Sequence, residues 1–407
     1  MAALRVLIVG AGIGGLAAAV GLRRAGHQVT VVEQAKAISE VGAGLGLGPN
    51  ATGALFSLGL RERLQQSAVA PTAATRRRWK DGRELFRGEL AEVAENRGYP
   101  FWFAHRGDLQ SAMLAAATDP TLPGTPANII LGVRCEGLDV ESTSIRTSTG
   151  RLEADLILGA DGIRSRIRQE LFGEDEPRFS GNTAYRTQVD SDVAFGDPEL
   201  RPFVERNGFE SWLGQDGHVV HCPFRAGTQL NVTACMEAEA IGNGLTSASV
   251  DKDELLTALD GWYEPLRRLV QRGGPVTRYD LYDLPSLDTW VQGRVALLGD
   301  AAHPMLPYLG QGAAQAIEDG EYLYRVFAEV HDSDSIDGAL AEYERVRKPR
   351  ATRVQDVSRA NRAVFHLPDG PEQEARDREI ARGATDSEVY RWLWHFDPTE
   401  RLTTSTP

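Results

Sequence analysis

Three glycines near the amino terminus have the spacing of a dinucleotide-binding turn. Gly10, Gly12 and Gly15 fit the pattern G-x-G-x-x-G, and Glu33 follows at roughly the expected distance of about 20 residues. In such a turn the first glycine permits the bend, the second lets a pyrophosphate approach the backbone, and the third lets a helix pack against a strand. The Glu33 carboxylate would accept hydrogen bonds from both hydroxyls of an adenosine ribose and would repel a 2′-phosphate. These residues predict bound FAD or NAD, and a glycine-rich turn with a surface glutamate is the alternative.

Two aspartates follow short apolar runs later in the chain. Asp161 comes after the run Leu156–Leu158, and Asp300 comes after the run Val295–Leu298. Such runs form buried strands of parallel sheets, and ligands bind outside the carboxyl ends of these strands. Asp300 is therefore better placed for a ligand than for solvent. Asp161 precedes a glycine, so a plain Asx turn is an alternative interpretation of this residue.

A histidine lies in an alternating stretch in the middle of the chain. On a strand, His218 and Cys222 share one face, whereas His221 points to the other. Imidazole titrates nearest to neutrality, so His218 is a candidate general base toward a hydroxyl group. A structural strand histidine is the alternative. Because His218 and His221 face apart and no third ligand lies nearby, we expect no metal site here.

The composition is that of an ordinary globular protein with an acidic surface. The chain has 407 residues and a net charge of −13, so no whole-chain basic field attracts nucleic acid or anionic lipid. Its length favours two packed domains. Cys135, Cys222 and Cys235 form no C-x-x-C pair, which argues against a disulfide framework and fits a reducing cytoplasm. Without a run of about 18 strongly apolar residues, no membrane span is predicted.

The elements around the glycines predict a β-α-β unit. Val6–Val9 and Val29–Val32 are short β-branched runs, and the Ala- and Leu-rich segment Leu16–Arg24 lies between them. Residues 179–275 differ, because their short alternating pieces are typical of an antiparallel sheet; a helical segment at 251–271 ends this region. A long charged amphipathic helix is predicted over residues 338–363.

Three stretches extend beyond a generic nucleotide-binding unit. They are His105–Leu109 (HRGDL), Asp155–Gly162 (DLILGADG) and Gly299–Pro304 (GDAAHP). At this spacing they resemble the single-component FAD-dependent aromatic hydroxylases, which have the para-hydroxybenzoate hydroxylase-like fold. The resemblance covers nearly the whole chain. Gly299–Gly320 and the tail Trp392–Asp397 are most similar to the salicylate and 3-hydroxybenzoate hydroxylase-type branch.

The resemblance implies an α/β fold made of discontinuous parts. A Rossmann-like FAD-binding domain would consist of residues 1–73, 101–178 and 276–337. A mostly antiparallel β-sheet domain that binds the substrate would be inserted into it, from residues 74–100 and 179–275. Residues 338–407 would form a C-terminal helical segment.

The resemblance also implies roles at the cofactor. Glu33 would bind the adenosine ribose, and Arg106 would approach the ribityl-pyrophosphate region, although an arginine in the first turn of a helix is often a surface ion pair. Asp161 would lie by the pyrophosphate and serve NAD(P)H, and Asp300 would bind a ribityl hydroxyl. A loop with Pro307, Gly310 and Gly312 would flank the flavin ring, where the following helix N-terminus would stabilise negative charge.

In the 3-hydroxybenzoate and 6-hydroxynicotinate hydroxylase branches a histidine lies in a matching strand, and this resemblance implies that His218 is the catalytic base. A tyrosine often follows four residues later, where this chain has Cys222. Cys222 and Arg186 are predicted to line the substrate pocket, since arginine pairs with carboxylates. Trp102 is predicted either there or in the core.

The implied function is hydroxylation of a small phenolic or hydroxylated aromatic acid, with or without loss of CO₂, through a flavin hydroperoxide. The chain would use FAD, O₂ and NADH, or NADPH in its place, as a cytoplasmic monomer or homodimer. No second G-x-G-x-x-G motif exists for the nicotinamide cofactor. The alternative is a flavin-dependent tailoring monooxygenase or epoxidase acting on a larger polycyclic or alkene substrate. A plain NAD-dependent dehydrogenase would leave the motifs at Asp161 and Asp300 unexplained.

Overall fold

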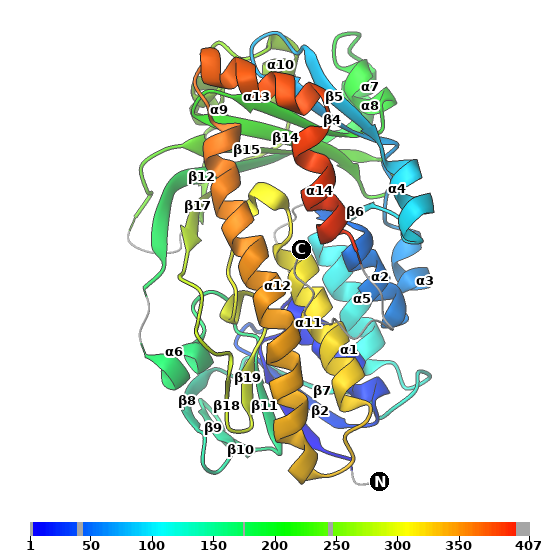
Figure 1. The fold of residues 1–407 in the computed structure, drawn as a ribbon, viewed down its shortest axis with the longest axis vertical. Coiled ribbons are helices and arrows are strands. Elements are labelled where there is room, and N and C mark those ends of the chain that lie inside the picture. Colours follow the sequence, from blue (N-terminus) through cyan, green and yellow to red (C-terminus); the bar gives the residue numbers. More distant parts are fainter. Residues whose placement is uncertain (1–2, 39–43, 174–175, 243–246, 396–407) are drawn as a thin grey trace.

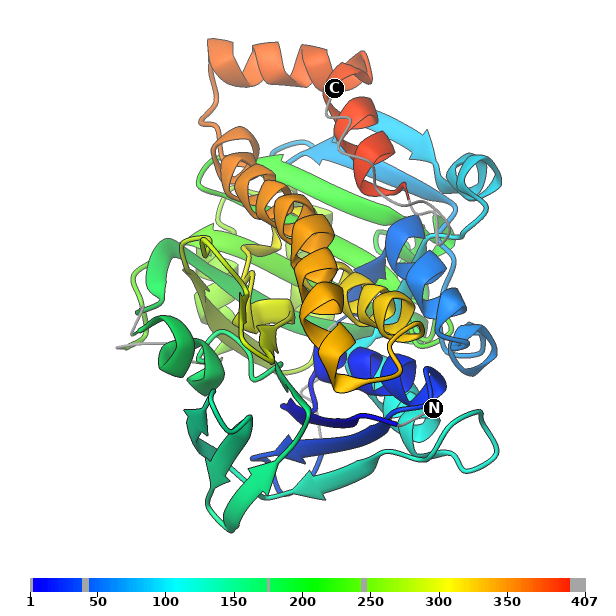
Figure 2. The same ribbon diagram turned by 60° about the horizontal axis from the view of Figure 1, so that its bottom comes forward.

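The computed structural model describes residues 3–38, 44–173, 176–242 and 247–395, and the tail residues Phe396 and Asp397 lie outside them. Its first layer is a six-stranded sheet (Figures 1 and 2). In spatial order the strands are β18 (Val291–Gln292), β19 (Val295–Leu297), β11 (Leu156–Gly159), β1 (Arg5–Val9), β2 (Gln28–Glu33) and β7 (Asn128–Leu131). All neighbours are parallel except β18 and β19. The predicted β-α-β unit is confirmed as β1, α1 (Ile13–Arg24) and β2.

Helices α1, α5 (Arg106–Thr118) and α11 (Gly312–Phe327) pack around this sheet. The small residues of α1 and α11 allow their backbones to approach closely. A Cβ atom on Gly21 would lie 2.7 Å from Tyr324, and one on Gly320 would lie 2.6 Å from Ala17. Larger side chains at these positions would push the two helices apart.

The second layer is an eight-stranded sheet, most of it antiparallel as predicted. Its strands, in spatial order, are β16 (Ser247–Val250), β17 (Val276–Asp283), β12 (Arg178–Asp190), β15 (Gln229–Glu237), β14 (Gly217–Phe224), β13 (Phe209–Gly214), β4 (Ala73–Arg78) and β5 (Glu84–Glu89). Only β13 and β4 pair in parallel. The segment 74–100 thus supplies the last two strands at one side of the inserted sheet, with β5 at its edge.

The end of the inserted sheet differs from the expected boundary at residue 275. Strand β17 begins at Val276 and pairs with both β12 and β16, so the sheet runs on to Asp283. The sequence of β17 does not indicate which sheet it joins, because its pairing depends on its neighbours, and one of them, β12, lies far from it in the chain. The return to the first layer comes with β18.

Smaller elements complete both layers. Strand β3 (Gly44–Leu47) pairs with β6 (Trp102–His105), and a three-stranded sheet holds β8 (Cys135–Asp139), β9 (Ser144–Thr147) and β10 (Gly150–Glu153). The remaining short helices are α2 (Pro49–Ser57), α3 (Arg61–Gln65), α4 (Leu90–Arg97), α6 (Arg166–Phe172), α7 (Ser191–Phe195), α8 (Arg201–Glu205), α9 (Lys252–Ala258) and α10 (Glu264–Arg272), with 3-10 turns η1 (Gly299–Ala301), η2 (Pro307–Leu309) and η3 (Ser333–Ser335). Among the described residues, no helix combines the length and apolarity needed to cross a membrane.

The C-terminal segment is helical, as predicted, with α12 (Ile336–Phe365), α13 (Pro371–Ala381) and α14 (Ala384–Leu393). The long helix α12 crosses both layers (Figure 2). Near its start the Tyr343 hydroxyl donates a hydrogen bond to the Leu297 carbonyl of β19, 3.0 Å away. Just beyond its end His366 reaches His218 of β14. One helix therefore ties the nucleotide-binding layer to the inserted sheet.

Candidate functional site

The glycine turn after β1 has the geometry that its spacing predicts. Gly10 has φ = +107°, and a Cβ atom there would lie 2.3 Å from the Ala160 carbonyl oxygen. A Cβ atom on Gly15 would lie 2.0 Å from the Gly10 carbonyl oxygen, so α1 begins directly against the turn. At Gly12 the same atom would meet nothing within 4 Å. The turn is closed on the sheet side at Gly10 and Gly15 and open at Gly12, where a ligand can approach the backbone.

Glu33 ends β2 beside this turn. Its Oε2 atom accepts a hydrogen bond from the Ala11 amide at 2.8 Å, and its Oε1 atom accepts one from the Ala35 amide at 2.8 Å. Each carboxylate oxygen can accept a second hydrogen bond. The side chain is thus held at the turn and retains acceptor capacity for hydroxyl groups.

A cavity of about 800 Å³ opens at this turn and continues between the two sheets. The predicted cofactor residues that line it are Gly12, Arg106, Asp300, Pro307, Gly310 and Gly312. The N-terminus of α11 faces it after the η2 turn, which Gly310 ends with φ = +63°. A Cβ atom on Gly312 would lie 4.0 Å from Oδ1 of Asp300. Burial raises the pKa of Asp300, while His303 and Arg106 oppose that rise.

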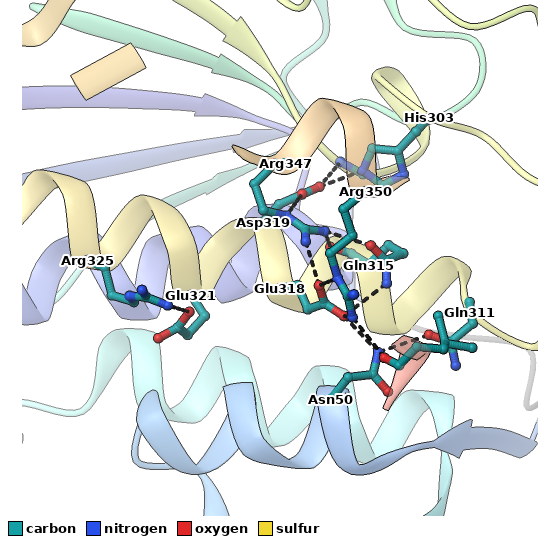
Figure 3. Close-up of polar contacts among 12 residues, drawn as sticks. Asn50, His303, Gln311, Gln315, Glu318, Asp319, Glu321, Arg325, Arg347 and Arg350 are labelled. Carbon is teal, nitrogen blue, oxygen red and sulfur yellow. Dashed lines mark hydrogen bonds and ion pairs between the residues drawn. The ribbon is translucent and has the colours of Figure 1, made fainter. Parts of the chain in front are cut away.

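A buried ionic cluster holds this end of the cavity (Figure 3). Asp319 of α11 accepts hydrogen bonds from His303 at 2.6 Å, from the Gly299 amide at 2.9 Å and from Arg347 of α12 at 2.8 Å. The preceding residue, Glu318, pairs with Arg347 and with Arg350. Burial alone would raise the pKa of Asp319, but His303 and Arg347 lower it to about 2. The cluster therefore fixes the turn that carries Asp300 against the first turns of α11.

Asp161 is used within the chain and not at the cavity wall. Its carboxylate accepts hydrogen bonds from the Ser165 hydroxyl and from the amides of Arg166 and Ile167, at 2.7 and 3.2 Å for the amides. These contacts cap α6, which carries Arg168 to within 3.4 Å of the Ala301 and Ala302 carbonyls. The neighbours of Asp161, Ala160 and Gly162, line the cavity in its place. The carboxylate thus caps a helix four to six residues away and does not form the plain Asx turn that was the alternative, while the cofactor role of Asp161 stays a prediction.

At the far end of the cavity lie His218 and Cys222, on one face of β14 as predicted. Both are buried. Burial, followed by His366 and Arg76, lowers the pKa of His218 well below its ordinary value, so the imidazole is neutral. Burial raises the pKa of the Cys222 thiol, which therefore stays protonated. His221 points the opposite way, with Nε2 3.4 Å from Oε2 of Glu210.

Arg186 of β12 also faces the cavity. Its guanidinium carbon lies 4.8 Å from the Tyr279 ring centroid, and Nε is buried without a hydrogen-bond partner in the described part of the chain. Burial lowers the pKa of Arg186. By contrast, Arg77 and Arg78 on β4 pair with carboxylates. Arg186 is thus a half-buried cation whose Nε atom is sealed from solvent and whose pKa no carboxylate of the described residues is seen to raise, and it is available to an anionic ligand.

Comparison with known proteins decides the family. The model of a family described as "FAD binding domain" matches residues 3–358. The chain belongs to this FAD binding domain family. It is 36% identical to the 3-amino-4-hydroxybenzoate 2-monooxygenase PtnB3 of Streptomyces platensis, over 97% of this chain and 96% of that protein. It is 34% identical to the FAD-dependent monooxygenase OpS4 of Beauveria bassiana strain ARSEF 2860, over 96% and 92%.

A solved structure described as a salicylate hydroxylase substrate complex superposes with a TM-score of 0.78, at 26% identity, over 97% of this chain and 96% of that one. These similarities confirm the resemblance predicted from the three motifs. The chain is an FAD-dependent monooxygenase of the single-component aromatic hydroxylase type.

The residues of this flavoprotein fit FAD. The open backbone at Gly12 and the N-terminus of α1 suit a pyrophosphate, since free N–H groups and the helix dipole favour anions. The α11 N-terminus and Asp300 face the same cavity farther along. Several glycines line the cavity between these points, and because they have no side chain a flat ring system can approach their backbone closely; they are Gly44, Gly46, Gly299, Gly310 and Gly312.

The structure decides one alternative that the sequence left open, and it adds one residue that the sequence did not indicate. Trp102 does not line the cavity; it is buried against Phe56, with ring centroids 5.2 Å apart. Side chains alternate along β6, so Phe101 and Phe103 face the cavity and Trp102 faces the core. Sequence reasoning also missed His366, the partner of His218, because no local pattern marks a histidine at the end of a long helix.

Proposed function

We propose that this FAD-dependent monooxygenase hydroxylates a small phenolic acid, with NADH or NADPH as reductant. One observation carries the proposal: His218, a neutral histidine, and Arg186, an arginine without a carboxylate partner among the described residues, face one cavity. A phenolic acid presents a hydroxyl and a carboxylate to such a pair. The names of the relatives, 3-amino-4-hydroxybenzoate 2-monooxygenase and salicylate hydroxylase, support the same class of substrate.

In this proposal Arg186 receives the substrate carboxylate. A guanidinium binds a carboxylate through two parallel hydrogen bonds, and the pair is strong where water is excluded. The cation is already desolvated, so binding an anion relieves the unfavourable burial of Arg186. Phe101, Phe103 and Phe209 line the same space and keep water from the ring.

His218 acts on the hydroxyl group. A neutral imidazole has a free lone pair, and removal of the phenolic proton makes the ring more electron-rich. The negative charge that the substrate brings raises the basicity of His218, while the positive charge of Arg76 stabilises the developing phenolate. Bound FAD would take electrons from NADH or NADPH and transfer one oxygen atom of O₂ to the ring. NADH is favoured over NADPH by family resemblance alone.

A panel assay tests the proposal on the purified flavoprotein. We expect 3-amino-4-hydroxybenzoate, 3-hydroxybenzoate or salicylate to accelerate NADH oxidation and to give a product one oxygen atom heavier, with product mass also reporting any loss of CO₂.

In Arg186→Met, KM for the responsive acid should rise about 100-fold, while KM for its carboxamide should hardly change. The Arg134→Met variant, at an exposed arginine, serves as the matched control. Stimulation by polycyclic or alkene substrates alone would contradict the proposal.

The second candidate is a larger substrate. The cavity continues past His218 toward Phe86 and Gly88 of β5 and toward Tyr390 and Trp394 at α14. This extension leaves room for a fused ring system. The same panel, extended to polycyclic phenols, distinguishes the two candidates.

A further inference from the structure

The strongest feature that the proposed function does not use is the contact behind His218. Nδ1 of His218 lies 2.9 Å from Nε2 of His366, and the ring centroids are 5.2 Å apart. His366 follows α12, 148 residues away in the chain, and does not line the cavity. It is also buried. The two imidazoles therefore share one hydrogen bond in a region closed to solvent.

We infer that His366 is a positioning residue that holds the proton of His218 on Nδ1, so that the unprotonated Nε2 faces the substrate. The inference rests on the proposed role of His218 as base and adds to it the group that orients this base. A hydrogen bond between two neutral imidazoles needs one donor and one acceptor. When Nδ1 of His218 donates to Nε2 of His366, the lone pair of His218 Nε2 is the one left for the substrate hydroxyl.

The surroundings keep both rings neutral. The charged and titratable groups that face the pair are Arg76 from β4, Tyr308 from η2, Arg362 from α12 and Arg376 from α13. Burial, followed by Arg362 and Arg376, lowers the pKa of His366 to about 4. Three arginines act on the two rings, and no carboxylate of the described residues is among the groups that shift their pKa. Each histidine is therefore uncharged near neutral pH in the free enzyme and carries a single ring proton.

The contact also supports His218 during proton transfer. As Nε2 of His218 gains the phenolic proton, positive charge develops on the ring, and its Nδ1–H bond becomes a stronger donor to His366. The O–H bond of the substrate breaks, the N–H bond at Nε2 forms, and no other group changes its electron count. Rings of Tyr308 and Phe365 pack against His218 at 5.5 and 5.3 Å between centroids, which limits its rotation.

Two substitutions of His366 separate positioning from packing. Glutamine keeps an acceptor oxygen near the place of Nε2, whereas phenylalanine keeps the ring volume and removes the acceptor. We expect kcat with the responsive aromatic acid to fall about 10- to 100-fold in His366→Phe and to stay within about 3-fold of the parent in His366→Gln. FAD content should be unchanged in both. His331→Phe, at an exposed histidine, is the matched control.

A second measurement needs no substrate. In FAD-loaded protein with ¹⁵N-labelled imidazole rings, the His218 signals are assigned from their loss in His218→Asn. We expect the parent and His366→Gln to carry the His218 proton on Nδ1 from about pH 6 to about pH 9, and His366→Phe to shift it to Nε2. An unchanged His218 tautomer together with an unchanged pH–rate profile in His366→Phe would overturn the inference. If the tautomer shifts but no aromatic acid is turned over, the proposed function fails and the positioning role stands.

Discussion

Oδ2 of Asp319 lies 2.6 Å from Nε2 of His303, and this contact joins α11 to the turn that carries Asp300. The same oxygen accepts the Gly299 amide, and the other carboxylate oxygen accepts Arg347 (Figure 3). A single carboxylate thus connects a strand end, a cavity loop and the long C-terminal helix. Its removal should affect stability and cofactor retention together.

We expect Asp319→Asn to lower the free energy of unfolding by about 3–5 kcal/mol, because it leaves Arg347 buried with part of its charge uncompensated. The Asp300 turn should loosen, and FAD should be lost faster on dialysis. Urea unfolding and FAD absorbance measure the two effects. Asp334→Asn, at an exposed aspartate, is the control, and equal stability of Asp319→Asn and the parent would contradict the role given to the cluster.

Gly10 and Gly12 should respond differently to alanine. Gly10→Ala meets the Ala160 carbonyl and requires a residue with a side chain at φ = +107°, so it should unfold at lower denaturant concentration. Gly12→Ala meets nothing in the chain and should keep its stability while FAD affinity drops by an order of magnitude or more, as expected when a methyl group blocks a phosphate approach. Denaturation midpoints and FAD titration separate the two outcomes. Unchanged FAD affinity in Gly12→Ala would remove Gly12 from the cofactor site.

His218→Asn should slow hydroxylation about 100-fold and divert NADH oxidation toward H₂O₂, because the base is lost while the flavin remains. FAD content should be that of the parent. His221→Asn is the matched control on the opposite face of β14: it should lower stability through Glu210 and leave the ratio of product to NADH unchanged. Equal coupling in His218→Asn and in the parent would exclude His218 as the base.

The raised pKa of Glu321 should make the stability of the folded chain depend on pH. Burial raises its pKa to about 7, against the opposing effects of Arg325 and the Ser57 hydroxyl. The folded chain therefore favours the protonated acid, so its stability is full below the ordinary pKa of glutamate and falls as the pH rises through 7. Glu321→Gln, which retains a hydrogen-bond acceptor for Ser57, should match the parent near pH 4 and be more stable by about 2 kcal/mol near pH 9. Parallel stability curves for the two proteins would refute the raised pKa.

The parts of the site that could be predicted are those made within one segment. The turn from Gly10 to Gly15 and the return at Glu33 follow from local backbone requirements, and the faces of β14 follow from strand alternation at His218 and Cys222. The hydrogen-bond partners of individual side chains could be predicted less well from the sequence. Whether Asp161 faces a ligand or caps α6 depends on Ser165 and on the path of the chain after it.

Long-range pairing explains the remaining differences. Trp102 and Phe103 are neighbours in sequence, and only the pairing of β6 with β3 determines which of them faces the cavity. Strand β17 joins the inserted sheet because β12 and β16 flank it. His366 meets His218 only because α12 is long enough to pass from one layer to the other.

Helix α12 has a consequence for how the molecule comes apart. Tyr343 and Arg347 hold one end to the nucleotide-binding layer, and His366 holds the other to the inserted sheet. If either layer unfolds, α12 loses its contacts with that layer. The nucleotide-binding layer and the inserted sheet should therefore unfold in one cooperative step. A substitution at His366, which contacts the catalytic-site residue His218, can therefore lower the free energy of unfolding of both layers.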